Sequence, residues 1–208
     1  MSQESEYDNQ IHSEHEVTFG AGKPERIVQA ILRYRSAGSV LELGAGEGRN
    51  ALYLAQNGFE VTAQDISEIG IDKMKKLAQE KGLAIKTEIR DSRTFDLARD
   101  YDIMICTFML HHFSREEALG LIKHIQDHTN SEGLNAISAF TTNGDFYRNN
   151  PGTKNFYPGI NELRELYADW QILEYEEAEG SAFAKKPDGS PMRNITARLL
   201  ARKLKQIR

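Results

Sequence analysis

Residues 39–51 read Ser-Val-Leu-Glu-Leu-Gly-Ala-Gly-Glu-Gly-Arg-Asn-Ala, and this stretch decides the fold of the chain. Its first part, from Val40 to Leu43, is a short and mostly apolar run, which is typical of a strand buried on both faces of a parallel sheet. Three glycines follow on alternate positions, and the apolar spacing after Arg49 predicts a helix. A strand, a glycine turn and a helix form the unit that holds nucleotide-like ligands at the carboxyl end of a parallel sheet.

The spacing of these glycines separates two classes of nucleotide-binding protein. A dinucleotide fingerprint reads G-x-G-x-x-G, with the third glycine packing the helix on the strand. Here Gly44, Gly46 and Gly48 read G-x-G-x-G, and Glu42 stands two residues before the first glycine. This combination resembles motif I of the class I S-adenosylmethionine (SAM)-dependent methyltransferases. For the glycines taken alone, a glycine-rich turn without a ligand remains the alternative.

The composition limits the class of protein. The chain has 208 residues, enough for one α/β domain, with 39% hydrophobic and 27% charged residues. Its net charge of -5 argues against a nucleic-acid partner, and no apolar run approaches the length of a membrane span. The polar, acidic N-terminus predicts neither a signal nor a transit peptide. The one cysteine, Cys106, allows no internal disulfide and no cysteine cluster, so we expect a cytoplasmic protein without a metal site.

Strands alternate with helices along most of the chain. We expect strands at 39–43, 59–65, 83–89, 101–107 and 133–140, and helices at 24–34, 49–57, 67–82 and from Ser114 onward. This alternation predicts an α/β fold with a Rossmann-like, doubly wound, mostly parallel sheet. Two further strands, at 170–177 and 194–203, flank an Asp-Gly turn, which predicts a C-terminal antiparallel hairpin and seven strands in all.

The ends of the chain are expected to differ in order. Residues 1–17 are predicted to form a flexible tail in which His12 and His15 are solvated, and residues 18–208 a single domain. Pro24 fits the first turn of the helix that follows the tail. We expect that helix to close over the edge of the binding site.

Polar residues stand at the ends of the second and third expected strands. Asp65 closes the second strand, 21 residues after Gly44, where an acid can accept hydrogen bonds from both ribose hydroxyls of an adenosine. Asp91 and Ser92 follow the third strand and are placed to meet the adenine edge, while Ile66 could pack on the adenine face. We therefore expect an adenosine at this edge of the sheet.

Candidate catalytic residues lie in two loops at the same edge. His111 and His112 follow the fourth strand, and a histidine can act as a general base near neutral pH. The alternative is one packed and one exposed histidine. Residues 141–158 form a long loop whose aromatic side chains favour a packed lid. Within it, Tyr147 and Arg148 are expected to face the substrate, and the arginine would attract an anion.

Three features taken together carry a closer resemblance. They are the run Glu-Leu-Gly-Ala-Gly-Glu-Gly-Arg-Asn-Ala-Leu-Tyr-Leu-Ala at 42–55, the acid Asp65, and Asn-Glu-Leu-Arg-Glu-Leu-Tyr-Ala-Asp-Trp at 161–170. With the Leu-Leu-Ala-Arg-Lys ending, they are similar to the tellurite-resistance (TehB-like) branch of the small-molecule methyltransferases. The resemblance implies an enzyme that transfers a methyl group from SAM to a small-molecule acceptor. A thiol, or a chalcogen oxyanion such as tellurite or selenite, is the candidate acceptor.

The resemblance also implies which residues hold SAM. The backbone of Gly44 and Gly46 would hold its methionine end. The Thr107 carbonyl would receive its ammonium group, and Lys23 would meet its carboxylate. The expected cofactor residues are Lys23, Glu42, Gly44, Ala45, Gly46, Arg49, Asp65, Ile66, Asp91, Ser92 and Thr107. The expected catalytic residues are His111, His112, Tyr147 and Arg148.

One departure from the branch concerns the acceptor. The branch places a His-Arg pair in the turn before the last strand, and Phe183-Ala184 occupy that place here. Two other functions remain open: a non-catalytic SAM-binding regulatory protein, and an NAD-linked oxidoreductase, which the glycine spacing and the hairpin disfavour. The expected partner is a small-molecule acceptor, with neither nucleic acid nor a membrane, and the protein is expected to be a monomer or a homodimer.

Overall fold

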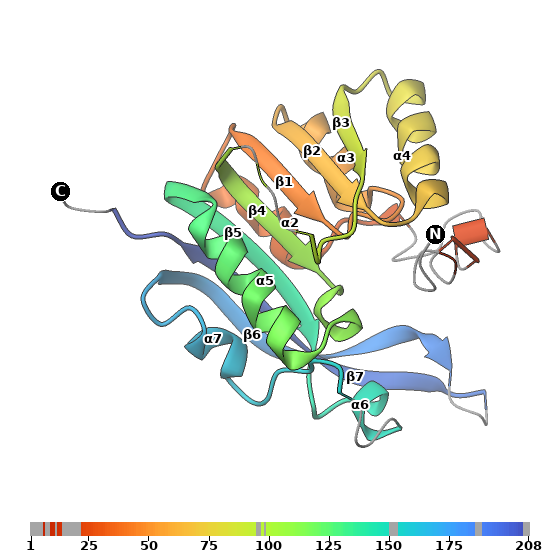
Figure 1. Ribbon diagram of the computed structural model, residues 1–208, viewed down its shortest axis with the longest axis vertical. Coiled ribbons are helices and arrows are strands. Elements are labelled where there is room, and N and C mark those ends of the chain that lie inside the picture. Colours follow the sequence, from red (N-terminus) through yellow and green to blue (C-terminus); the bar gives the residue numbers. More distant parts are fainter. Residues whose placement is uncertain are drawn as a thin grey trace.

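The protein is built on a seven-stranded sheet with helices on both faces (Figure 1). The computed structural model describes residues 6, 9–10, 12–13, 22–94, 97, 99–149, 154–185 and 189–205, with the backbone alone at 181–185. Across the sheet the strands run in the order β3-β2-β1-β4-β5-β7-β6. They are β1 (Ser39–Leu43), β2 (Glu60–Asp65), β3 (Ile85–Ile89), β4 (Tyr101–Thr107), β5 (Thr129–Phe140), β6 (Gln171–Lys185) and β7 (Pro191–Arg202).

The strand order places a switch point beside β1. The first five strands are parallel, and β7 is antiparallel to both of its neighbours. From β1 the chain winds outward through β2 and β3, and then returns to β4 on the other side of β1. Ligands of open α/β sheets bind beyond the carboxyl ends of the strands at such a point. The predicted doubly wound sheet with its C-terminal antiparallel hairpin is confirmed.

The two faces of the sheet carry separate cores. Helices α2 (Arg26–Ala30), α3 (Arg49–Gln56) and α4 (Glu68–Glu80) pack on one face, and α5 (Arg115–Asp127) and α7 (Glu162–Glu165) pack on the other. Within β1, Leu41 and Leu43 belong to the core under α5, whereas Val40 belongs to the core under α2. Because both faces are covered, the central strands need apolar residues at nearly every position.

Strand ends differ from the expected ones where the pairing is between distant parts of the chain. β5 begins at Thr129 instead of Gly133, and the non-glycine residue Glu132 has a positive φ of 61° within it. β6 continues to Lys185, beyond the expected end at residue 177, because it pairs with β7 over most of its length. Strand formation depends on the neighbouring strand more than on local propensity, so these ends were not readable from the sequence.

Local signals for the helix ends are largely confirmed. Ser67 Oγ accepts a hydrogen bond from Gly70 N at 3.0 Å, and Ser114 begins α5 with a complete capping box. Gly58, with φ of 85°, follows the end of α3. The expectation for Pro24 is wrong, because it precedes the N-cap residue of α2 instead of standing in its first turn.

Two kinds of feature are absent from the described ranges. No helix there is long and apolar enough to cross a membrane. The same residues contain no group of three or more His, Cys, Asp and Glu side chains that could hold a metal ion. Cys106 lies buried in β4, and burial, with a contribution from Glu42, raises the pKa of its thiol to about 12. A thiol in that state is an inert core residue.

Candidate active site

The glycine turn joins β1 to α3 at the C-terminal edge of the sheet. Gly44 and Gly46 have φ of 66° and 54°, in the left-handed region that residues with a Cβ rarely adopt. Two backbone donors tie the turn to β2. Ala45 N donates to Gln64 O at 2.9 Å, and Gly46 N donates to Asp65 Oδ2 at 2.6 Å. The turn is therefore held in one conformation by its neighbour strand.

Asp65 ends β2 and is 8% exposed. While Oδ2 accepts the hydrogen bond from Gly46, Oδ1 accepts one from Ser67 N at 2.8 Å. The carboxylate thus connects the glycine turn to the start of α4, a structural task that the sequence did not reveal. An ionised carboxylate has about four acceptor positions, so Asp65 retains the capacity to bind further donors.

Glu42 is the buried acid of the site, with 1% of its surface exposed. Its Oε1 accepts a hydrogen bond from Asn50 Nδ2 at 2.7 Å, and its Oε2 has no partner among the described residues. Burial raises the pKa of Glu42 to about 7, although the hydrogen bond from Asn50 and the charge of Arg49 oppose the shift. A cation placed beside Oε2 would favour the ionised carboxylate.

The residues expected at the adenine lie beside the end of β2. Arg90 N donates to Asp65 O at 2.9 Å, which brings the loop after β3 against the end of β2. In this loop Asp91 is partly buried and Ser92 is buried. Ile66, directly after Asp65, is also partly buried. The structure therefore brings these residues together at one corner of the edge.

Two other expected cofactor residues lie near the end of β4. Thr107, at the end of β4, accepts a hydrogen bond at Oγ1 from Asn50 Nδ2 at 3.2 Å. Arg49 is the first residue of α3, and its guanidinium lies 5.7 Å from the ring centroid of Phe108. Lys23 is exposed in the loop before α2. Thr107 and Arg49 thus face the part of the edge between the glycine turn and the next loop.

His12 contradicts the expectation that the N-terminal histidines are solvated. It is 4% exposed, and its Nδ1 lies 3.1 Å from Glu47 Oε1. A Cβ added to Gly46 would lie 3.4 Å from the His12 ring. Asn9 accepts hydrogen bonds from the first turn of α4. His12 and Asn9 therefore contact the glycine turn and the start of α4, the two segments that Asp65 connects. His15 lies outside the described residues.

Aromatic rings gather beyond the ends of β4 and β5. We call them the aromatic chamber, and its members are Phe108, Phe140, Phe146, Tyr147 and Tyr157. The ring centroids of Phe108 and Phe140 lie 4.9 Å apart, and those of Tyr147 and Tyr157 lie 5.6 Å apart. Phe108 has a positive φ of 55°, a strained conformation for a residue with a Cβ that is found most often at functional sites.

His111 lies in the 3-10 helix η3 (Leu110–His112) and joins the aromatic chamber. Its ring centroid lies 5.2 Å from that of Phe140 and 6.1 Å from that of Tyr157. Its Nδ1 is buried without a partner among the described residues. Burial, with a contribution from His112, lowers the pKa of His111 to about 3. The ring is therefore neutral at pH 7, and the general-base role of either histidine stays a prediction; His112 is exposed.

The loop after β5 is packed, as its aromatic residues predicted. It contains α6 (Asp145–Arg148), and further along Phe156 is 1% exposed. Asn194 of β7 accepts a hydrogen bond at Oδ1 from Phe146 N at 2.9 Å and so fixes the start of α6. A Cβ on Gly144 would collide with the same asparagine. Arg148 is exposed at the end of α6, and residues 150–153 lie outside the described residues.

Unpaired buried polar atoms are concentrated at this edge. Among the described residues, the buried side-chain atoms without a hydrogen-bond partner are Glu42 Oε2, His111 Nδ1, Ser138 Oγ and Asn194 Nδ2. Their residues lie on β1, after β4, near the end of β5 and at the start of β7, where Thr141 N donates to Ile195 O. Buried polar groups are nearly always paired in folded proteins, so these four atoms call for polar partners, which ordered water or a bound ligand would supply.

A family model described as "Tellurite resistance protein TehB" matches residues 8–199. The chain belongs to the TehB family. The "Probable S-adenosyl-L-methionine-dependent methyltransferase TehB" of Haemophilus influenzae (strain 10810) is 35% identical over 164 residues. The match covers 79% of this chain and 57% of that protein, so the chain spans less than two thirds of the length of its TehB-family relative.

Solved structures agree on the fold. The crystal structure of TehB from Haemophilus influenzae matches with a TM-score of 0.79 at 30% identity, covering 94% of this chain and 67% of that one. The N-methyltransferase NodS from Bradyrhizobium japonicum, in complex with S-adenosyl-L-homocysteine (SAH), matches with a TM-score of 0.74 at 13% identity. That match covers 97% of this chain and 99% of NodS. The chain therefore has the class I methyltransferase fold.

The departure from the TehB pattern at Phe183-Ala184 falls in the outer half of β6. Only the backbone is described there, so both side chains lie outside the described residues. The backbone of this half of β6 pairs with the first part of β7, where Ser181 lies opposite Arg193. The structure thus places these two residues in a strand, and the expectation that they stand in the turn before the last strand is wrong.

Sequence reasoning missed several residues that the structure brings to the site. Asn50 carried a readable signal, because it shares the buried face of α3 with Ala51 and Leu54, and a buried polar residue needs a reason. Ser138 and Asn194 carried none, since their surroundings arise from the pairing of β5 with β7. The same holds for Phe140, which looks from the sequence like any residue of a strand.

Proposed function

We propose that this chain binds SAM at the C-terminal edge of its sheet and transfers the methyl group to a small-molecule acceptor held in the aromatic chamber. The observation that carries the proposal is the set of four unpaired buried polar atoms at that edge. Membership of a family with a curated SAM-dependent methyltransferase supports the same conclusion.

The residues of the glycine-turn end fit the chemistry of SAM. Glu42 Oε2 is a buried, unpaired acceptor and suits the ammonium group of the methionine end, together with the Thr107 carbonyl. The backbone of Gly44, Ala45 and Gly46 would lie along that end, with Lys23 and Arg49 balancing its carboxylate. Asp65 would take the ribose, and Ile66, Asp91 and Ser92 would enclose the adenine.

SAM supplies a sulfonium-bound methyl group, and transfer breaks the carbon–sulfur bond as the acceptor lone pair forms a new bond, leaving SAH. Such an in-line displacement depends mainly on positioning. The aromatic rings around His111 would exclude water from the reacting atoms. Tyr147 and Arg148, on α6, would close the chamber from the loop side.

The neutral polar groups of the chamber favour a soft acceptor. The buried His111 ring carries no charge at pH 7, and Asn194 Nδ2 offers unpaired donors. A nucleophile with an available lone pair, such as a thiolate or a chalcogen oxyanion like tellurite or selenite, needs no strong base. We therefore place these compounds first among the acceptors, with the basic Arg148 and His112 at the rim rather than as proton acceptors.

The test is release of SAH by the purified protein. The protein is incubated with SAM and with tellurite, selenite or small thiols in turn, and SAH is measured by mass spectrometry. Turnover with at least one acceptor supports the proposal. Tight SAM binding without turnover on any acceptor would instead support a SAM-binding regulatory protein. Binding of NADH in preference to SAM would overturn the proposal.

A further inference from the structure

A row of polar residues runs across one half of the sheet, from the end of β4 to the edge strand β6. Thr107 of β4 lies opposite Ser138 of β5, Ser138 lies opposite Arg198 of β7, and Arg198 lies opposite Glu176 of β6. Apart from Glu176, these residues are at least nine-tenths buried. Burying such groups costs free energy unless they are paired, so the partners of each residue in the row matter.

The inner end of the row is held by Asn50. Its Nδ2 donates both to Glu42 Oε1 and to Thr107 Oγ1, and its Oδ1 accepts a hydrogen bond from Glu25 N at 2.8 Å. Asn50 is 1% exposed, so it has no rotamer freedom once these three bonds are made. The orientation of the Glu42 carboxylate therefore depends on where the backbone of Glu25 lies.

Arg198, toward the outer end of the row, helps to hold the backbone of Glu25 in place. The Glu25 carboxylate forms a buried ion pair with Arg198 Nε, with exposures of 9% and 11% for the two side chains. Arg198 Nη1 also lies 3.4 Å from Glu176 Oε1, and Arg26 lies 3.4 Å from the same oxygen. Helix α2, which Glu25 begins, is five residues long and has no side-chain cap. The ion pair thus joins this loop to β7, in addition to the buried side chains of Ile27, Val28 and Ala30 on α2.

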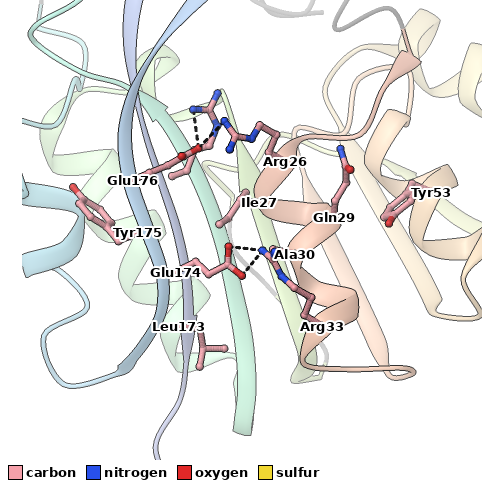
Figure 2. A pocket seen from close by; sticks show the side chains of 11 residues that line it. Arg26, Ile27, Gln29, Ala30, Arg33, Tyr53, Leu173, Glu174, Tyr175 and Glu176 are labelled. Atoms are coloured by element: carbon pink, nitrogen blue, oxygen red, sulfur yellow. Dashed lines mark hydrogen bonds and ion pairs between the residues drawn. The ribbon is translucent and has the colours of Figure 1, made fainter.

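Glu176 and Arg26 belong to the wall of an open groove of about 720 Å³ between α2 and β6. Figure 2 shows their side chains meeting at one end of the groove, while Arg33 and Glu174 form a second ion pair farther along. Arg198 lines the same groove. The second pair joins the 3-10 helix η2 (Ile31–Arg33) to β6 and shares no residue with the hydrogen bonds of Asn50, which makes it a natural control.

We propose that Glu25 and Arg198 are positioning residues for cofactor binding. Their ion pair positions the Glu25 N–H for its hydrogen bond to Asn50 Oδ1. Asn50 in turn orients the Glu42 carboxylate so that Oε2 faces the cofactor. The inference rests on the proposed function, because it takes the ligand at Glu42 to be SAM. It adds two residues that lie outside the binding edge and act only through Asn50.

The experiment is isothermal calorimetry of SAH binding to the full chain. In Glu25→Leu/Arg198→Leu both buried charges are removed together, a replacement that often leaves stability unchanged. We expect SAH affinity to fall about tenfold, within the range for residues joined in one hydrogen-bond network. Glu25→Gln, whose amide oxygen can still accept from Arg198, is expected to bind SAH like the wild type. The control Arg33→Leu/Glu174→Leu is expected to do the same.

A double-mutant cycle separates positioning from a general loss of structure. In an Asn50→Leu background, removal of the Glu25–Arg198 pair should cause no further loss of SAH affinity, because the pair acts through Asn50. Wild-type affinity in the folded Leu/Leu variant, an additive loss on top of Asn50→Leu, or an equal loss in the control would each overturn the inference. If the wild type binds neither SAM nor SAH, the proposed function fails first and the inference falls with it.

Discussion

The C-terminal edge of the sheet has a glycine-turn end, at β1 and β2, and an aromatic end, at β4 and β5. Backbone atoms shape the first end, and side chains shape the second. At the ends of β1 and β2, the contacts that shape the site are made by backbone donors, such as Gly46 N and Ser67 N on Asp65. At the ends of β4 and β5 the site is shaped by side chains, with His111 among the rings of Phe140 and Tyr157.

Because of this difference, the two ends should tolerate amino-acid substitutions to different extents. A site formed by backbone atoms needs glycines and one acid at fixed positions. It therefore requires a short sequence motif that many sequences can share. A side-chain-built site can change its chemistry by single substitutions without disturbing the chain path. We therefore expect the glycine-turn end to determine that SAM binds, and the aromatic end to determine what is methylated. Substitutions at the two ends should therefore change SAH affinity to very different degrees.

Gly46→Val should abolish measurable SAH binding, a loss of more than about 100-fold, while the protein stays folded. Valine is strained at φ of 54°, and its branched side chain would occupy the space beside the His12 ring, 3.4 Å from the Cβ position. Calorimetry provides the measurement. The matched control is Gly58→Ala, because Gly58 has φ of 85° but open space around it. The control should lose about 1 kcal/mol of stability and no affinity. Unchanged affinity in Gly46→Val would refute the placement of the site.

Asp65→Ala should weaken SAM and SAH alike, by about 10- to 150-fold, since hydrogen bonds to a charged acceptor contribute roughly 1.5–3 kcal/mol. Both ligands share the ribose, so a loss confined to SAM would place Asp65 near the sulfonium instead. The control is Asp102→Ala. Asp102 also accepts a backbone hydrogen bond, from Ser39 N at 2.9 Å, but at the opposite end of β1. That variant should lower the melting temperature without changing affinity.

SAH affinity should rise about tenfold between pH 6 and pH 8, because Glu42 with a pKa of about 7 ionises in this range and its carboxylate binds the ammonium group. Calorimetry at several pH values should show this slope in the wild type and none in Glu42→Gln. The stability of the free protein should change in the opposite direction. The raised pKa contributes stability that is fully present below about pH 4.5 and is lost as the pH rises through about 7, by at most about 3 kcal/mol. A flat affinity profile in the wild type would remove Glu42 from the ammonium site.

Tyr147→Ala and Arg148→Ala should leave SAH affinity within about threefold, a change of roughly 0.65 kcal/mol, while lowering turnover with the acceptor identified by screening. Both residues lie on α6 at the aromatic end, away from the glycine turn. Arg99→Ala, which removes an exposed arginine before β4, is the control and should change neither quantity. Lost SAH binding with unaltered acceptor kinetics would show that α6 covers the cofactor, and the division between the two ends would fail.

The sequence alone determined the parallel sheet, its C-terminal hairpin and the glycine turn after β1. These follow from short-range patterns, because a buried parallel strand is apolar throughout and a left-handed turn demands glycine. It also placed Asp65 at the end of β2, since the length of a βα unit varies little. The ends of β5 and β6 escaped prediction because each depends on a partner strand far along the chain.

The charge states of the site residues follow only from the tertiary structure. The sequence cannot show that His111 is held neutral or that the pKa of Glu42 rises to about 7, because both shifts come from burial by distant residues. Nor can it show that Glu25 meets Arg198, 173 residues later in the chain. Local propensity and spacing carry the fold, whereas desolvation and pairing are properties of side chains that come together only when the sheet is complete.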